Sequence, residues 1–162
     1  MDRIATFEKV SKEQWSQVVP GAAGYDDIKL PQRATSGSAG YDFYSTMSFR
    51  LQPGESILIP TGIRCHMNDG WVLMLYPRSG LGFKYQIRLA NSVGVCDADY
   101  YFSDNEGHIM LKLVNGGDKI VTIESGQGIA QGIFVQYGIT TDDNVTAVRN
   151  GGFGSTDNTH IS

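Results

Sequence analysis

The sequence has few charges, few cysteines and no long apolar run. Charged residues make up 19% of the 162 residues, and the formal net charge is −4. Such a balance leaves no basic patch of the kind that holds duplex nucleic acid, so no direct nucleic-acid partner is expected. No apolar run approaches the roughly 18 residues of a membrane span, and the N-terminus lacks a basic-then-apolar signal pattern. We therefore expect a soluble cytoplasmic protein that binds no membrane.

The two cysteines, Cys65 and Cys96, indicate neither a zinc site nor a disulfide framework. Each lies in an apolar, strand-like run, and the pair has no C-x-x-C spacing. We expect two buried, reduced thiols. A chain of 162 residues is long enough to bury one core, and a single domain is predicted.

Glycine, in contrast, is abundant, with 20 residues, and helical periodicity is almost absent. Short runs of β-branched and aromatic residues are bounded by Gly, Pro, Asn or Asp, as strands are. The predicted strands are residues 56–60, 71–76, 108–114, 119–124 and 129–137. Because turn signals recur at intervals of roughly ten residues, the pattern predicts an all-β barrel or jelly roll. The Gly-, Pro- and Ser-rich stretch 20–40 is predicted to be an extended loop.

Two short helices are also predicted. Ser11 is a suitable N-cap for a helix that begins in the run Lys12–Trp15. The second helix follows Pro77, which ends a strand, and has Ser79 as its N-cap. Its free N–H groups, beside Arg78, would form a phosphate site, and the alternative is an ordinary capped surface helix.

The segment from Leu89 to Tyr100 ends an apolar run in a carboxylate, Asp97. Burying a carboxylate costs several kcal/mol unless it is paired or has a chemical role, so Asp97 is a candidate general base for a water. Asp99 would point the same way if the segment were a strand. Tyr100 offers a flat face for a sugar, and Asn91 an amide that reads the edge of a base. The alternative is two turn carboxylates in a β-hairpin.

Asp42 and Gln131 are two further polar candidates. Asp42 follows a glycine-containing loop and would sit near a metal ion or its waters; the alternative is a turn carboxylate that caps local amides. Gln131 is a lone polar residue in an apolar strand, and the default is that it satisfies a neighbouring backbone group.

A glycine cluster near the C-terminus carries the groups needed to grip a nucleoside triphosphate. Phe153 can stack on a base, Arg149 can pair with a phosphate, and Ser155 and Thr156 can donate to phosphate oxygens. Glycines such as Gly154 let the backbone approach a ligand closely. The alternative is a disordered, glycine-rich tail.

These segments, in this order, resemble the five motifs of the trimeric deoxyuridine triphosphatases (dUTPases). The resemblance covers about Leu30 to Asp157. The matching segments are residues 34–42, 77–82, 91–100, 126–131 and 151–156.

The resemblance implies a jelly-roll-like, distorted β-barrel that forms a homotrimer with active sites at its subunit interfaces. Residues 1–148 would form the barrel domain, with residues 1–29 as an N-terminal extension. Residues 149–162 would form a flexible arm that closes over a neighbouring site. The implied reaction is Mg²⁺-dependent hydrolysis of dUTP to dUMP and pyrophosphate.

The resemblance also assigns roles residue by residue. Asp97 would deprotonate the water that attacks the α-phosphorus, and Asp42 would reach Mg²⁺ through water. The phosphates would be held by Arg78, Ser79, Gly80 and Gln131, and the γ-phosphate by Arg149, Ser155 and Thr156. The nucleoside would contact Asn91, Val95, Cys96, Tyr100, Met110 and Phe153, with Gly154 in the same motif. Tyr100 would pack under the deoxyribose and leave no room for a 2′-hydroxyl.

Three departures from the family pattern stand out. Gly128 replaces a common arginine of the fourth motif, only Asn150 separates Arg149 from the paired glycines, and residues 101–106 lengthen a hairpin. Two other functions remain open: a dCTP deaminase, which resembles the same fold, and a nucleotide-gated interaction module.

Overall fold

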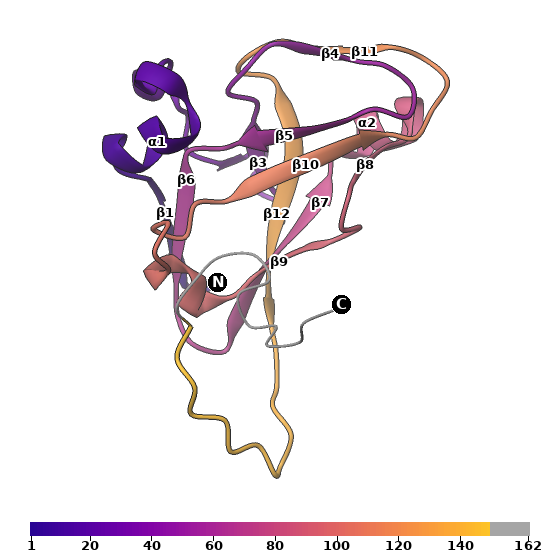
Figure 1. The fold of residues 1–162 in the computed structure, drawn as a ribbon. Helices are drawn as coiled ribbons and strands as arrows, with labels where there is room; N and C mark the ends of the chain where they lie inside the picture. The colour runs from indigo at the N-terminus through magenta and orange to yellow at the C-terminus, as the bar shows by residue number, and fades with distance from the viewer. Residues whose placement is uncertain (150–162) are drawn as a thin grey trace, which may run out of the picture.

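The computed structural model describes residues 1–149, and it is built almost entirely of antiparallel strands (Figure 1). Four sheets have the strand orders β1-β6, β5-β10-β8, β11-β4 and β2-β3-β12-β7-β9. The strands are β1 (Ala5–Lys9), β2 (Gln32–Arg33), β3 (Tyr41–Tyr44), β4 (Phe49–Leu51), β5 (Ser56–Pro60), β6 (Ile63–Met67), β7 (Trp71–Pro77), β8 (Ile87–Leu89), β9 (Gly94–Cys96), β10 (Met110–Asn115), β11 (Val121–Ile123) and β12 (Gly128–Gln136). The predicted all-β, jelly-roll-like fold is confirmed.

One core joins the larger sheets. Phe43 of β3, Leu73 of β7 and Ile129 of β12 come from the five-stranded sheet, while Ile59 of β5 and Leu111 of β10 come from the three-stranded sheet. All five side chains are almost fully buried in the same cluster. Strand alternation places them inward, and the burial of this apolar surface holds the sheets together.

The five strand predictions are confirmed, with small shifts at their ends. β10 begins at Met110 rather than at residue 108, and β11 is confined to Val121–Ile123. The loop prediction for residues 20–40 is wrong in part, because this stretch contains two 3₁₀ turns and the short strand β2. The turns are η1 (Pro20–Ala22) and η2 (Tyr25–Asp27).

Both predicted helices are present. Helix α1 (Lys12–Val18) is capped by Ser11, whose Oγ accepts a hydrogen bond from the Gln14 N–H at 3.1 Å. Helix α2 (Ser79–Tyr85) has Arg78 rather than Ser79 at its N-cap, and no side chain caps it. The prediction for Ser79 is wrong because the helix begins one residue earlier, with Arg78 in extended conformation.

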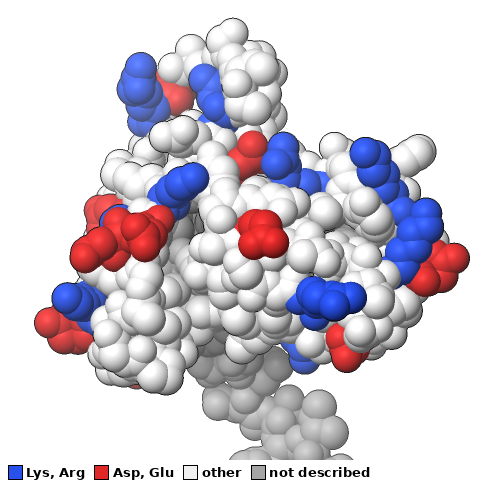
Figure 2. All heavy atoms as spheres, turned by 90° about the horizontal axis from the view of Figure 1, so that it is seen from above, with Lys and Arg blue, Asp and Glu red and all other residues white. Residues whose placement is uncertain are grey.

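The N-terminal extension packs onto the barrel. β1 pairs with β6 along its whole length, from Ala5↔Met67 to Lys9↔Ile63. Trp15 of α1 is 1% exposed, and its indole N–H donates to the Ala23 carbonyl at 2.9 Å. Neither α-helix in the described part of the chain has the length and apolarity to span a membrane. On the face shown in Figure 2, acidic and basic side chains are interspersed among uncharged ones.

Candidate active site

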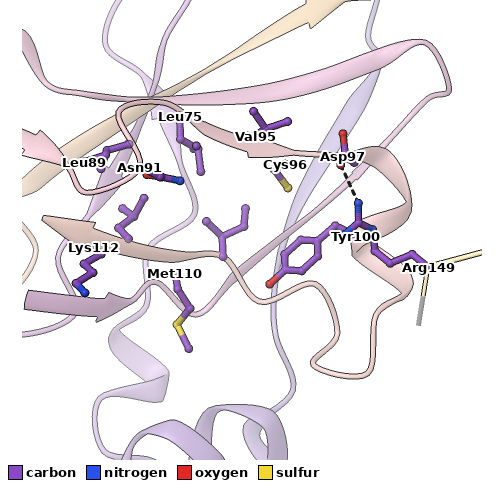
Figure 3. Close-up of a pocket in the computed structure, with 13 residues that line it drawn as sticks. Leu75, Leu89, Asn91, Val95, Cys96, Asp97, Tyr100, Met110, Lys112 and Arg149 are labelled. Carbon is purple, nitrogen blue, oxygen red and sulfur yellow. Dashed lines mark hydrogen bonds and ion pairs between the residues drawn. The ribbon is translucent and has the colours of Figure 1, made fainter. Parts of the chain in front are cut away.

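A pocket of about 190 Å³ opens beside β9 and the turn that follows it (Figure 3). Seven of the predicted site residues line this pocket: Asn91, Val95, Cys96, Asp97, Tyr100, Met110 and Arg149. Asn91 lies at one end of the pocket and Asp97 and Arg149 at the other (Figure 3). Sequence reasoning missed Leu75, Leu89 and Lys112, which also line it. Nothing in their strand-like contexts distinguishes them from ordinary core or surface residues.

Close packing of β9 on β7 builds one wall of the pocket. Gly94 lies opposite Leu75 and Cys96 opposite Leu73. A Cβ at Gly94 would lie 3.0 Å from the Leu75 Cβ, so glycine permits this close approach. Alternation along the strand buries Cys96 and leaves Val95 58% exposed.

Asp97 lies where β9 ends and a 3₁₀ turn, η3 (Ala98–Phe102), begins. It occupies the N-cap position, but its side chain makes no capping hydrogen bond and is 50% exposed. The expected strand geometry for Asp97 and Asp99 is wrong, because β9 stops at Cys96. The turn nevertheless directs both carboxylates toward one cation.

That cation is Arg149. Its Nη2 lies 2.8 Å from Asp97 Oδ2, and its Nε lies 2.9 Å from Asp99 Oδ1. The chain leaves the barrel after β12 and returns to η3 to make these contacts (Figure 1). Although both carboxylates are half-exposed, the arginine side chain is only 16% exposed. A two-point pair of this kind fixes the guanidinium more firmly than a single contact would.

Tyr100 forms a rigid wall of the pocket and is 6% exposed. Its hydroxyl donates to the His108 carbonyl at 2.6 Å and accepts from Asn105 Nδ2 at 2.9 Å. Burial raises the pKa of Tyr100, so the phenol is neutral at neutral pH.

Both cysteines are free and buried. Burial raises the pKa of Cys96 to about 12, and the neighbouring Asp97 adds to this effect. Burial also raises the pKa of Cys65, and the nearby Cys96 adds to it. A thiol with a raised pKa is a poor nucleophile. Cys96 therefore contributes shape rather than reactivity to the pocket wall.

A second group of predicted residues gathers where β3, β12 and β7 run side by side. Gln131 of β12 lies opposite Asp42 on one side and Tyr76 on the other. Arg78 Nε lies 3.3 Å from Asp42 Oδ1. Gln131 Nε2 donates to the Pro77 carbonyl at 3.2 Å, so the default expectation for this side chain is confirmed.

The structure does not bring the two groups into one pocket. Asp42, Arg78, Ser79, Gly80 and Gln131 all lie outside the residues that line the cavity around Asp97. Within residues 1–149 no cluster of three or more His, Cys, Asp or Glu side chains is placed to hold a metal ion. Phe153, Gly154, Ser155 and Thr156 lie outside the described residues.

Comparison with known proteins places the chain in a family. The dUTPase family model matches residues 26–157. The deoxyuridine 5′-triphosphate nucleotidohydrolase of Lactococcus lactis subsp. lactis (strain IL1403) is 43% identical over 132 residues, which cover 80% of this chain and 88% of the relative. The protein of the same name from Hahella chejuensis (strain KCTC 2396) is 42% identical over 139 residues, covering 81% and 88%.

Solved structures agree. The dUTPase from Streptococcus mutans has a TM-score of 0.66 and 34% identity, covering 83% of this chain and 97% of its own. The dUTPase of phage phi11 of S. aureus, described as coordinating a structural Mg(II) ion, has a TM-score of 0.67 over 90% of this chain and 98% of its own. At 19% identity it supports the fold alone. Because the family model and the relatives span most of the sequence, the chain belongs to the dUTPase family.

Proposed function

We propose that the protein is a cytoplasmic enzyme that hydrolyses dUTP to dUMP and pyrophosphate by attack of water on the α-phosphorus. The observation that carries the proposal is the single pocket that Asn91, Tyr100 and Asp97 line together. It offers an amide for a base, an aromatic face for a sugar and a carboxylate for a water. Membership of the dUTPase family supplies the substrate and the hydrolase class.

The nucleoside binds between Asn91 and Tyr100. The Asn91 amide and the backbone of Val95 and Cys96 read the uracil edge. Cytosine presents the opposite hydrogen-bond polarity at position 4, which would leave buried groups unpaired. Met110 lines the same pocket. Tyr100 lies under the deoxyribose and excludes a 2′-hydroxyl, and Phe153 stacks on the base.

Asp97 is the general base in this proposal. Its carboxylate is half-exposed and is not used to cap η3, so a water can reach it. Accepting a proton from that water makes the oxygen a better nucleophile as it approaches phosphorus. Arg149 now pairs with Asp97 and Asp99, and the γ-phosphate competes for the same guanidinium. Arg149 therefore exchanges carboxylates for phosphate when the triphosphate binds.

In this proposal the phosphates are held by Arg78, Ser79, Gly80 and Gln131. Further phosphate contacts come from Ser155, Thr156 and the backbone at Gly154. Arg78 supplies the charge, and the exposed Ser79 and Gly80 present the first turn of α2. Phosphoryl transfer asks a protein mainly for positioning and charge neutralisation. A few placed groups therefore suffice in a chain whose net charge is −4.

The residues fit Mg²⁺ held mainly by the substrate. The described chain has no cage of three acidic or imidazole side chains, and Asp42 is a lone carboxylate beside Arg78. Mg²⁺ commonly keeps several waters and binds through one or two carboxylates plus substrate phosphates. Asp42 would hold the ion through water. When bound, the ion neutralises charge on the triphosphate.

We further propose that the active enzyme is a homotrimer. The phosphate-binding and nucleoside-binding groups do not share a pocket within one chain. Neighbouring subunits would bring these groups together at each interface. Arg149 pairs with Asp97 of its own chain, and the rest of the arm, residues 150–162, would close over another subunit's pocket. Closure would exclude bulk water and strengthen the polar contacts.

The test is product analysis combined with a matched pair of variants. Incubation with dUTP, dCTP and the other common dNTPs should release pyrophosphate from dUTP alone, whereas ammonia from dCTP would identify a deaminase. Asp97→Asn should lower kcat by about 10²–10⁴-fold while dUTP still binds. Asp99→Asn removes the other partner of Arg149 and should leave most of the turnover. Nucleotide binding by the wild-type protein without any product would indicate an interaction module instead.

A further inference from the structure

The Tyr100 hydroxyl is fixed by residues that the family motifs do not contain. Tyr100 is followed by the lengthened segment 101–106, and Asn105 of this segment donates to the hydroxyl at 2.9 Å. The hydroxyl in turn donates to the His108 carbonyl at 2.6 Å. The phenol is therefore held as both donor and acceptor, and its ring is braced from behind the pocket.

Asn105 is itself held in one orientation. Its Oδ1 accepts from the Gly107 N–H at 3.1 Å, and its backbone carbonyl accepts from the His108 N–H at 3.1 Å. Gly107 has φ +70°, and a Cβ there would lie 2.6 Å from the Tyr100 carbonyl oxygen. Only glycine tolerates both conditions. The loop is thus folded tightly onto the backbone of the residue whose side chain it supports.

The N-terminal extension, residues 1–29, makes hydrogen bonds to the same loop, residues 101–106. Glu106 accepts hydrogen bonds from the backbone N–H and the hydroxyl of Ser11, the N-cap of α1. The Tyr101 hydroxyl donates to Glu8 of β1 at 2.8 Å. The indole ring of Trp15 lies 5.9 Å from the imidazole of the fully buried His108. The family model begins only at residue 26, so these contacts come from outside it.

We propose that Asn105 is a positioning residue for sugar selection, and that the segment from β1 to α1 clamps the loop that carries it. The proposal rests on the proposed function, because it requires Tyr100 to pack under the deoxyribose. To exclude a 2′-hydroxyl, the Tyr100 ring must stay in place, because a shift of the ring by about the size of an oxygen atom would make room for that group. Releasing the Tyr100 hydroxyl lets the ring shift, and a ribonucleotide then fits.

The principal variant is Asn105→Ala, measured by kcat and KM for dUTP and for UTP. The ratio of kcat/KM for UTP to that for dUTP should rise by roughly tenfold, since one partly buried hydrogen bond is lost. We expect kcat for dUTP to stay within about twofold, because Asp97 is untouched. Asp104→Ala, an exposed change in the same loop, is the matched control and should leave the ratio unaltered.

A double-mutant cycle separates positioning from general loosening of the loop. Tyr100→Phe removes the hydroxyl from the other side of the contact, so it should also raise the ratio, and Asn105→Ala should add little to it. If Asn105→Ala fails to fold, Tyr100→Phe still tests the hydrogen bond between the two side chains. Glu106→Ala, which releases Ser11, should shift the ratio in the same direction by less.

Three results overturn the inference. Suppose that the wild type hydrolyses dUTP selectively and that neither Asn105→Ala nor Tyr100→Phe changes the UTP-to-dUTP ratio. This result rejects the role of Asn105 and leaves the proposed function standing. A wild type that does not hydrolyse dUTP rejects the proposed function and this inference together. Additive effects in the cycle would show that Asn105 acts by a route other than Tyr100.

Discussion

Arg78 lies directly over the α-carbon of Gly128. A Cβ at Gly128 would come within 2.5 Å of Arg78 Nη1 and 3.2 Å of Arg78 Cδ. The fourth motif of the family commonly has arginine at this position, so the guanidinium of Arg78 occupies room that a side chain would otherwise take. From there it reaches Asp42 on the neighbouring strand. The glycine thus determines where the main phosphate-binding cation of the proposal sits.

Gly128→Ala should therefore damage activity more than stability. The clash falls on the far end of a flexible side chain, so Arg78 moves and the barrel keeps its fold. We expect kcat/KM for dUTP to fall by roughly tenfold, as for a lost charge-assisted contact. The melting temperature, measured by calorimetry, should change little.

Gly132 within β12 and Gly138 just after this strand serve as controls for that experiment. A Cβ at Gly138 would have no neighbouring atom within 4 Å, so Gly138→Ala should alter neither quantity. A Cβ at Gly132 would lie 2.8 Å from Leu73 Cδ1 and 3.0 Å from Phe43 Cε2 in the core. Gly132→Ala should cost about 1–3 kcal/mol of stability through overpacking. Equal loss of stability in Gly128→Ala and Gly132→Ala would contradict the explanation.

Asp42→Asn tests the partner of Arg78. An ion pair whose arginine is 43% exposed contributes only about 0–1 kcal/mol, so the free energy of unfolding should barely change. If Asp42 also holds Mg²⁺ through water, the Mg²⁺ concentration for half-maximal turnover should rise. Asp118→Asn, an exposed change in a distant loop, is the control. An unaltered Mg²⁺ dependence would remove Asp42 from the metal site.

Elements whose formation depends on neighbouring residues in the sequence could be predicted, whereas elements that depend on distant contacts could not. β5, β7 and β12 have apolar, turn-bounded sequences, and α1 carries its own cap at Ser11, so all were recognisable. β2, β4 and β9 are only two or three residues long and exist because neighbouring strands pair with them. Local propensity carries little information about such strands.

The same distinction applies to the site: some of its residues were recognisable from the sequence, and its long-range contacts were not. Asp97 and Tyr100, which line the pocket, were selected from the sequence because a carboxylate and an aromatic ring follow an apolar run. The hydrogen bond from Asn105 to the Tyr100 hydroxyl could not be predicted from the sequence, because it depends on the fold of a loop with Gly107 at positive φ. The pair between Arg149 and Asp97 joins residues 52 positions apart, which no local pattern encodes.

His108 should make the protein less stable in mild acid. Burial lowers the pKa of His108 from 6.5 to about 4, although Glu106 opposes the shift, and the ring is fully buried. The unfolded chain therefore takes up a proton first. Stability from this residue is complete above pH 6.5 and is lost as the pH falls toward 4, by an amount on the order of 3 kcal/mol.

The measurement is the free energy of unfolding by urea between pH 7 and pH 4 for wild type and His108→Gln. Glutamine can still accept from the Gly62 N–H, which His108 Nε2 does at 2.9 Å, but it does not titrate. The pH slope of the variant should be shallower than that of the wild type. Parallel slopes for wild type and His108→Gln would contradict the assignment.

Complementation between two inactive variants tests whether the segment after Arg149 serves a neighbouring subunit. Deleting residues 150–162 leaves the Arg149–Asp97 pair in place. The deletion should abolish most turnover and leave the melting temperature nearly unchanged, because the deleted sequence is rich in glycine and polar residues. Asp97→Asn should be inactive for a different reason. If each site combines Asp97 of one chain with the arm of another, unfolding and refolding an equal mixture should restore about a quarter of the sites. An arm that served only its own chain would restore none, because every chain in the mixture lacks one of the two parts.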